Sequence, residues 1–210
     1  MNSRSADRGF WMSADELKIK PLRLMAAACN NMGIGKNGQM PWHLPSELKY
    51  YMDTTKKVSK PGKFNIMVWG KGTWLANPES MYSLLPNIFH VILSTTMTTV
   101  PKHAHYICKD FDSIINLASQ PHLCDLVEII WVLGGPQVYQ EAMMHPLCDL
   151  IYLTDIMADF DCDVFFPPFD RSLFRKQERF PGVPNTIQEE NGVQFRFQVF
   201  KREEIETQCT

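Results

Sequence analysis

The stretch Met32–Glu47, MGIGKNGQMPWHLPSE, holds a glycine-punctuated loop, a tryptophan and a carboxylate close together in the chain. Glycine adopts backbone conformations closed to other residues, so this loop can lie close against a flat ligand and can also move. Pro45 favours the first position of a helix, because the amide that proline lacks would be unpaired there. Apolar residues at helical spacing extend this helix from 46 to about 57. The pattern predicts a mobile loop beside Glu47, a carboxylate in the first turn of a helix.

The bulk composition indicates one large domain that binds a small ligand. The chain has 210 residues, of which 45% are hydrophobic and 21% charged, and this is ordinary for a globular protein with a sizeable core. Its net charge of −2 gives no support to a nucleic-acid or acidic-membrane partner, because such binding needs many cations. No apolar run reaches the roughly 20 residues of a membrane span. We expect a cytoplasmic protein, and a monomer, with no nucleic-acid or membrane partner.

The cysteines, at positions 29, 108, 124, 148, 162 and 209, are scattered and form no C-x-x-C pair. We interpret them as reduced, mostly buried thiols of a cytosolic protein. His103, His105 and Cys108 lie close in sequence, but on a strand Cys108 faces the side opposite to the two histidines. Surface histidines are therefore the favoured interpretation, and we expect no metal site there.

Residues 1–20 differ in composition from the rest of the chain and lack the apolar core of a signal peptide. We interpret them as a weakly ordered extension that precedes a single domain over residues 21–205.

Short apolar runs alternate with helical patterns along this domain. Strands are predicted at 22–29, 64–69, 88–93, 103–108, 128–133, 150–156, 174–180 and 193–201, and further helices at 111–119 and 137–144. Asn191-Gly192 is typical of a two-residue hairpin turn. Together these patterns predict an α/β fold: a single domain with a mostly parallel central sheet, helices on both faces and a C-terminal antiparallel hairpin.

Two predicted strand ends carry glycines where a phosphate could bind. Gly70-Lys71-Gly72-Thr73 offers free amides at a helix start, which suit either an anion or an ordinary helix cap. Gly134-Gly135 also joins a strand to a helix, and a ligand phosphate or ring could contact bare backbone there.

An ordered set of motifs resembles the dihydrofolate reductase family from about residue 22 to residue 201. The matching residues are NMGIGKNGQMPWHLP at 31–45, Glu47, Gly70-Lys71-x-Thr73-Trp74, Leu93-Ser94, Trp131-Val132-Leu133-Gly134-Gly135 with Tyr139, Thr154, and Phe165-Phe166-Pro167. A lone glycine motif is weak evidence, whereas a whole set in this order and spacing is specific.

The resemblance implies NADPH-dependent reduction of 7,8-dihydrofolate to 5,6,7,8-tetrahydrofolate by hydride transfer. It assigns Glu47 to orient the pterin and to favour its protonation, which suits a carboxylate whose pKa is raised by burial in an apolar pocket. Thr154 is then the hydroxyl that steadies Glu47, and Trp42 packs over the site through a bound water. Taken without the resemblance, a first-turn glutamate is more often a surface residue that compensates the helix dipole.

The resemblance also implies two sets of binding residues. The substrate-binding set, where antifolate inhibitors would also bind, comprises Met25, Ala26, Met40, Leu48, Tyr51, Leu133 and Tyr139. The cofactor-binding set comprises Ala27, Ile34, Gly35, Lys71, Gly72, Thr73, Ser94, Thr95, Lys109, Gly134, Gly135 and Val138. The two lysines of this set would favour the 2′-phosphate that distinguishes NADPH from NADH.

Three departures from the family pattern bear on ligand binding. Most members place an arginine just before the third strand, where it pairs with the α-carboxylate of the substrate's glutamate. Here Ile88 stands at that position, and no arginine occurs between Arg23 and Arg171. We expect weaker binding of the glutamate tail, or a lysine in place of the arginine. Trp69 replaces a smaller residue near the cofactor, and Tyr51 replaces a phenylalanine, which adds a hydroxyl that needs a partner when buried.

Two other functions stay open at this point. A catalytically idle relative that binds nucleotide or RNA could lack the arginine, and so could a related reductase acting on a different pterin or a pyrimidine. Retention of Glu47, Trp42 and Gly134-Gly135 argues against the first, and the flanking P-W-x-L-P motif argues against the second.

Overall fold

The computed structural model describes residues 19–83 and 86–203. Its strands are β1 (Leu22–Ala28), β2 (Gly33–Gly35), β3 (Phe64–Gly70), β4 (Ile88–Leu93), β5 (Tyr106–Cys108), β6 (Val127–Val132), β7 (Cys148–Ile156), β8 (Val164–Phe165), β9 (Phe174–Lys176), β10 (Gln188–Glu190) and β11 (Val193–Arg202). Its helices are α1 (Pro45–Thr55), α2 (Lys71–Ala76), α3 (Ser80–Ser83), α4 (Phe111–Ala118) and α5 (Pro136–Met144). The predicted extension falls mostly on residues 1–18, which lie outside the described part of the chain, as do residues 204 and 205 of the predicted domain.

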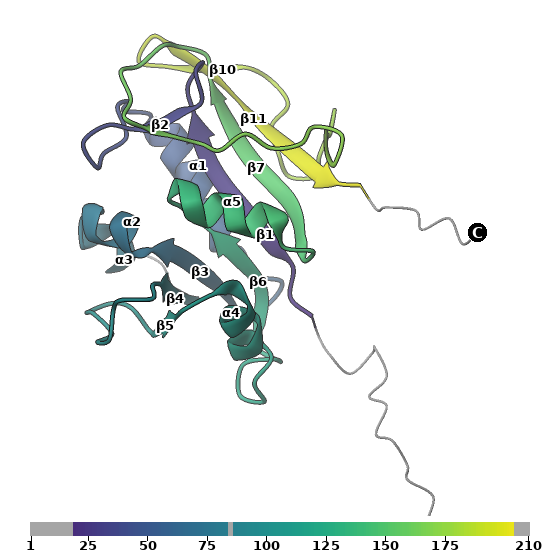
Figure 1. The fold of residues 1–210 in the computed structure, drawn as a ribbon. Helices are drawn as coiled ribbons and strands as arrows, with labels where there is room; N and C mark the ends of the chain where they lie inside the picture. The colour runs from purple at the N-terminus through teal and green to yellow at the C-terminus, as the bar shows by residue number, and fades with distance from the viewer. Residues whose placement is uncertain (1–18, 84–85, 204–210) are drawn as a thin grey trace, which may run out of the picture.

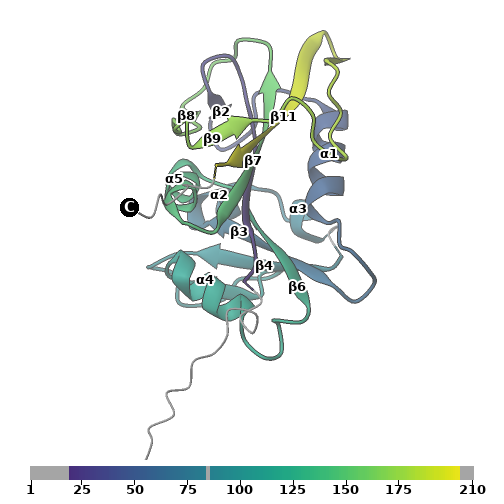
Figure 2. The ribbon, with the colours of Figure 1, turned by 90° about the vertical axis from the view of Figure 1, so that its right-hand side faces the viewer.

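A large mixed sheet forms the centre of the molecule (Figure 1), with strand order β10-β11-β7-β1-β6-β3-β4-β5 and with β9 also paired to β11. The strands from β7 to β5 in this order run parallel, and β11 is antiparallel to β7. Helices α4 and α5 cover one face and α1 covers the other (Figure 2). The central parallel strands are almost continuously apolar because both of their faces are buried. The predicted fold class is confirmed.

The C-terminal hairpin forms where Asn191-Gly192 predicts it. Strands β10 and β11 pair antiparallel on either side of these two residues, whose φ angles are 52° and 75°. A two-residue hairpin turn of this kind requires positive φ at both positions, which asparagine and glycine tolerate best.

Two predicted strands are shorter in the structure than the sequence suggests. The strand predicted at 103–108 begins at Tyr106, because His103 adopts a left-handed conformation with φ of 66°. The strand predicted at 174–180 ends at Lys176, and Phe180 instead packs its ring against Tyr152.

Three short elements were not predicted at all, namely β2, β8 and α3. Strands β2 and β8 pair with each other in a separate antiparallel ribbon (Figure 2), and β2 contacts β1. This ribbon anchors one end of the glycine-rich loop that continues toward α1.

Five cysteines fall in the described residues, and each has a free thiol. Across residues 19–83 and 86–203, none of the helices is long and apolar enough to cross a membrane.

Candidate active site

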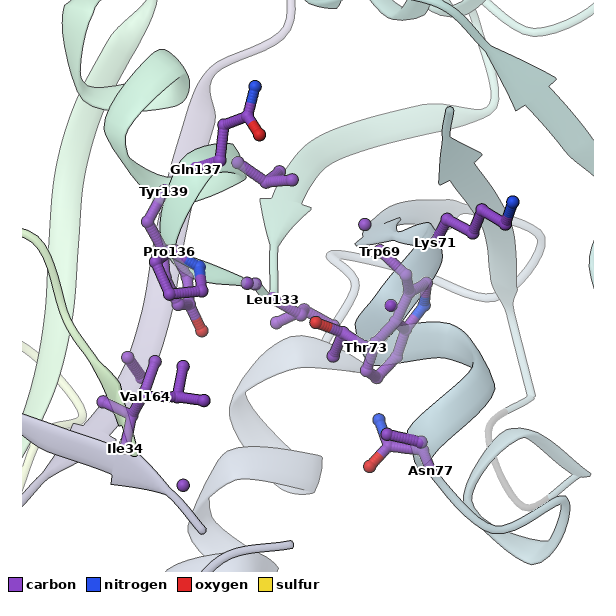
Figure 3. Close-up of a pocket in the computed structure, with 18 of the residues that line it drawn as sticks. Ile34, Trp69, Lys71, Thr73, Asn77, Leu133, Pro136, Gln137, Tyr139 and Val164 are labelled. Atoms are coloured by element: carbon purple, nitrogen blue, oxygen red, sulfur yellow. The ribbon is translucent and has the colours of Figure 1, made fainter. Parts of the chain in front are cut away.

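A cavity of about 690 Å³ opens at the carboxyl ends of β1, β3, β4 and β6. Its other walls come from the loop after β2 and from helices α1, α2 and α5. Figure 3 shows Ile34 and Val164 together on one side, Trp69 and Asn77 on the opposite side, and Leu133 between them. Ligands of open α/β sheets bind at this edge, because the strand ends and their loops leave a crevice there.

Every residue of the predicted substrate and cofactor sets lines this one cavity. The two sets therefore meet in space although they are spread from Met25 to Tyr139. Their individual roles remain predictions.

Glu47 is the buried carboxylate of the cavity. Its side chain is 5% exposed and accepts a hydrogen bond of 2.9 Å from Thr154 Oγ1, on β7. Burial raises the pKa of Glu47, and the hydrogen bond from Thr154 offsets part of this rise. Glu141, the other carboxylate among the described lining residues, is exposed on α5, where it accepts a hydrogen bond from Gln137.

Hydrogen bonds with Glu190 and Asn191, which lie far from α1 in sequence, fix the start of α1. No side chain within α1 caps its first turn, which begins at Pro45. Glu190 does so instead, accepting hydrogen bonds from Ser46 N at 2.9 Å and from Ser46 Oγ at 2.7 Å. Asn191 Nδ2 donates to His43 O at 2.9 Å. The hairpin β10–β11 therefore fixes the helical turn that carries the carboxylate.

Trp42 lies beside the cavity and is not among its lining residues. The indole is 8% exposed and packs edge-on against Phe160, with ring centroids 5.5 Å apart. Its Nε1 has no hydrogen-bond partner among the described residues. A buried indole N–H of this kind suits a water-mediated contact, since unpaired buried donors are costly.

The glycines at two strand ends touch each other. Gly70 N donates to Gly134 O at 2.7 Å, and the peptide bond between Gly134 and Gly135 is cis. A Cβ at Gly70 would lie 2.9 Å from Val138 Cγ2, and a Cβ at Gly135 would lie 3.3 Å from Thr73 Oγ1. These positions accept no side chain without movement of their neighbours, so bare backbone faces the cavity at the starts of α2 and α5.

Tyr139 closes the wall behind these glycines. Its hydroxyl donates to Met25 O at 2.8 Å, and burial raises its pKa. The hydroxyl is therefore a neutral structural donor that ties α5 to β1.

Comparison with known proteins decides the family. The family described as dihydrofolate reductase matches residues 21–202, nearly the whole described chain. The chain belongs to the dihydrofolate reductase family. It is 38% identical to rat dihydrofolate reductase over 89% of its own length and 100% of the relative's. It is 39% identical to the Drosophila melanogaster dihydrofolate reductase, over 85% of its own length and 96% of the relative's.

The structural comparison gives the same family. The dihydrofolate reductase of Schistosoma mansoni superimposes with a TM-score of 0.75 at 28% identity, covering 88% of this chain and 100% of that one. The chain is thus an NADPH-dependent oxidoreductase.

The cavity of this dihydrofolate reductase fits a dinucleotide on its cofactor side. No side chain caps the N-termini of α2 and α5, so the backbone amides of their first turns, apart from that of Pro136, which has no N–H, suit phosphate oxygens. Lys71 and Lys109 supply positive charge there, and Lys71 Nζ donates to Thr96 Oγ1 at 3.1 Å. Ser94 Oγ accepts from the backbone amides of Thr96 and Met97, which fixes this turn. Ser94 therefore also has a structural role in the loop.

An aromatic cluster fills the space behind Trp69, and of its members the sequence analysis names only Trp69 and Trp74. Trp69 Nε1 donates to His90 Nδ1 at 3.1 Å, and the rings of Trp74 and Tyr82 stack with centroids 3.7 Å apart. Burial lowers the pKa of His90 to about 4, so this histidine is neutral. The signal in the sequence was a histidine within the apolar run IFHVIL at 88–93.

Ile88, at the position expected for an arginine in this family, lies in the same apolar cluster as Trp69 and Tyr82. Its side chain is 4% exposed. The cations among the described lining residues are Lys71 and Lys109, both in the predicted cofactor set.

Several lining residues fall outside the two predicted sets, some on loops or unpredicted strands and others, such as Trp69 and Leu93, on predicted strands. They are Gly38, Gln39, Trp69, Gly70, Ala76, Asn77, Met81, Leu93, Thr96, Pro136, Gln137, Glu141 and Val164. Val164 faces the cavity because β8 pairs with β2, and a two-residue strand leaves no periodic pattern to detect.

Proposed function

We propose that this dihydrofolate reductase reduces 7,8-dihydrofolate to 5,6,7,8-tetrahydrofolate, with Glu47 orienting the pterin and favouring its protonation. The observation that carries the proposal is the buried Glu47, hydrogen-bonded to Thr154 at the base of the cavity. A pterin offers an amino group and ring nitrogens side by side, and a carboxylate accepts hydrogen bonds from two such donors at once.

The residues around Glu47 suit proton delivery. Burial raises its pKa toward the range in which a carboxyl both holds and releases a proton at neutral pH. Thr154 holds one carboxylate oxygen and leaves the other available to a ligand. Trp42 has an unpartnered indole N–H nearby and would hold the water through which the proton reaches the imine nitrogen.

The walls on the cofactor side of the cavity would let the nicotinamide and the pterin lie against each other. NADPH supplies the hydride when it is bound. Ala26 and Ala27 on β1 have small side chains that allow flat rings to approach the sheet, and Ile34 borders the same space from β2. The loop after β2, including Gly38 and Met40, borders this part of the cavity, and its closing over bound rings would exclude water from them.

The direct test is the loss of NADPH absorbance in the presence of dihydrofolate. We expect activity in the parent chain, and in Glu47→Gln a fall in turnover of roughly 100-fold or more at neutral pH. The matched control is Glu178→Gln, which removes an exposed carboxylate outside the cavity and should keep parental turnover. An inactive parent chain, or full activity in Glu47→Gln, would contradict the proposal.

A second candidate, reduction of a dihydropterin that lacks a glutamate tail, is favoured by one observation. Ile88 is buried among aromatic rings where family members usually present a cation. The described lining residues near α1 therefore offer no positive charge to a tail carboxylate. This candidate keeps the same role for Glu47 and differs in what the outer half of the cavity recognises.

A further inference from the structure

The thiols of Cys29 and Cys162 lie in contact with each other next to strand β2. Cys29 directly follows β1 and is buried, whereas Cys162, in the segment between β7 and β8, is partly exposed. Their Sγ atoms are 3.8 Å apart although the residues are 133 positions apart in sequence. At this distance the two sulfur atoms are in van der Waals contact.

The thiols are tied to β2 by specific contacts. Cys29 Sγ donates to Asn31 Oδ1 at 3.1 Å, and the same oxygen accepts a hydrogen bond from Gly33 N at 3.1 Å. A Cβ at Gly33 would lie 2.6 Å from Cys162 Cβ and closer still to Cys162 Sγ. The backbone of β2 therefore rests directly on the Cys162 side chain.

The same contacts lead from the thiols to the cavity. Strand β2 pairs with β8, and Asp163 N donates to Gly35 O at 3.0 Å. Ile34 of β2 and Val164 of β8 both line the cavity and lie together in Figure 3. A change in the distance between the two sulfur atoms thus acts on the ribbon that forms one wall of the active site.

We propose that Cys29 and Cys162 form a redox-modification site, in which a peroxide converts the two thiols to a disulfide and thereby slows turnover. The partly exposed Cys162 reacts first through its thiolate form: the sulfur attacks one peroxide oxygen, the O–O bond breaks to give a sulfenic acid, and the released hydroxide takes up the former thiol proton and leaves as water. The sulfur of Cys29 then attacks the sulfenic sulfur, and a second water leaves. Overall, two thiols and one hydrogen peroxide give one disulfide and two waters, and a dithiol reverses the change.

Disulfide formation requires the ribbon to move. The two sulfur atoms must approach from 3.8 Å to about 2.05 Å. The bond also removes the thiol proton that Cys29 donates to Asn31, so Asn31 Oδ1 loses one of its two donors. Cys29 is fixed by the sheet, so the displacement falls on the segment around Cys162 and on the β2 backbone that rests on it.

In the absence of oxidant the pair rests as two thiols. Burial and the neighbouring Cys29 raise the pKa of Cys162, so the reactive thiolate is the minor form and the oxidation needs peroxide in excess. The other cysteines of the described residues have no comparable partner: Cys108 and Cys148 are buried singly, and Cys124 contacts Pro121 O.

The experiment treats the full chain with hydrogen peroxide, alkylates the remaining thiols and maps the peptides by mass. We expect a linked peptide pair containing Cys29 and Cys162, two hydrogen atoms lighter than the sum of its free forms. Turnover of the oxidised chain should fall by about tenfold or more, because misplacing reacting groups by about 1 Å can cost roughly 100-fold in rate. Dithiothreitol should restore it.

Two variants separate this site from general oxidation. Cys162→Ser should form no linked pair and should keep its turnover after peroxide, whereas Cys124→Ser should behave as the parent chain does. Alkylation of both Cys29 and Cys162 after peroxide, a linked pair that leaves turnover unchanged, or an equal loss of turnover in Cys162→Ser would each overturn the proposal. The mass measurement needs no enzymatic activity, so its failure is distinct from failure of the proposed function.

Discussion

At the scale of single residues, the proposed chemistry depends on one carboxylate, Glu47, whose burial penalises its charged form. Glu47 is almost fully buried beside Tyr51 and Leu48, and its side chain accepts a hydrogen bond from Thr154. Burial of a carboxylate favours its neutral form, so the folded state holds the Glu47 proton more tightly than the unfolded chain does. Function and stability therefore oppose each other at this residue.

Replacing Glu47 by glutamine should stabilise the fold at neutral pH. Because the pKa of Glu47 is raised in the folded state, its contribution to stability is complete below the pKa of the unfolded chain and is lost as pH rises through the folded pKa. Glutamine does not titrate. Denaturant unfolding should show a larger free energy of unfolding for Glu47→Gln than for the parent at neutral pH, with a smaller difference in mildly acidic buffer. An equal difference at both pH values would show that burial of the charge is not the cause.

Thr154 should set where the pH profile of the enzyme changes. Thr154→Val removes the donor that lowers the pKa of Glu47, so the ionisation of Glu47 should appear at higher pH in a plot of kcat/KM against pH. A charged hydrogen bond is worth roughly 1.5–3 kcal/mol, so a loss of about tenfold or more in kcat/KM should accompany the shift. Thr154→Ser keeps the hydroxyl and should retain the parental profile. Equal shifts in both variants would assign Thr154 to packing alone.

At the scale of elements, the site depends on two strand ends that come into contact. The ends of β3 and β6 meet where Gly70 N donates to Gly134 O. The helices that follow, α2 and α5, begin at this junction with uncapped amides. One contact therefore sets the positions of both helix N-termini that face the cofactor side.

A methyl group at this junction should disturb both stability and cofactor binding. In Gly70→Ala the new Cβ would lie 2.9 Å from Val138 Cγ2 and 3.2 Å from Gly134 O, and overpacking of this kind costs roughly 1–3 kcal/mol. We expect a lower thermal midpoint and weaker NADPH binding by fluorescence titration. Gly72→Ala, with nothing within 4 Å of its Cβ, should not lower the midpoint, since alanine favours a helix more than glycine does. Equal midpoints for the two variants would show that the junction is not tightly packed.

Sequence patterns predicted those helices, strands and turns whose structure is determined by their own residues. Apolar runs such as FNIMVW at 64–69 and the Asn191-Gly192 turn carry their structure locally. Strands β2 and β8 could not be found in this way. Strand β2 has three residues, two of them glycine, and β8 has two residues, so neither is long enough to show an alternation of apolar and polar side chains. They are strands because each pairs with the other, which is a property of the folded chain.

At the scale of the whole molecule, charge is divided between the two ends of the cavity. Lys71 and Lys109 lie on the β4 and α2 side, and Glu47 is the buried charge on the α1 side. The sequence could place these residues in one site only through the resemblance to a family, because no local pattern shows that Glu47 and Thr154 touch. It could not predict how Trp74, Tyr82 and His90 fill the volume behind Trp69, because they come from separate segments.

No cation stands among the described residues that line the cavity on the α1 side, which should make the enzyme indifferent to the glutamate tail. We expect kcat/KM for dihydrofolate and for dihydropteroate, which lacks the glutamate, to differ by less than about tenfold, since a charged hydrogen bond of roughly 1.5–3 kcal/mol would separate them by at least that factor. Steady-state kinetics with both substrates measures the ratio. A preference for dihydrofolate well above tenfold would mean that a lysine takes the place of the arginine.

The anchoring of α1 by Glu190 and Asn191 has a consequence for synthesis of the chain on the ribosome. Ser46 and His43 emerge early, but the side chains that hold them belong to residues made almost 150 positions later. Thr154 likewise lies on a strand whose neighbour, through the pairing of Thr154 with Phe197, is translated still later. A nascent chain that ends before residue 190 therefore lacks the contacts that Glu190 and Asn191 make with the start of α1, and these form only after the hairpin β10–β11 has been translated.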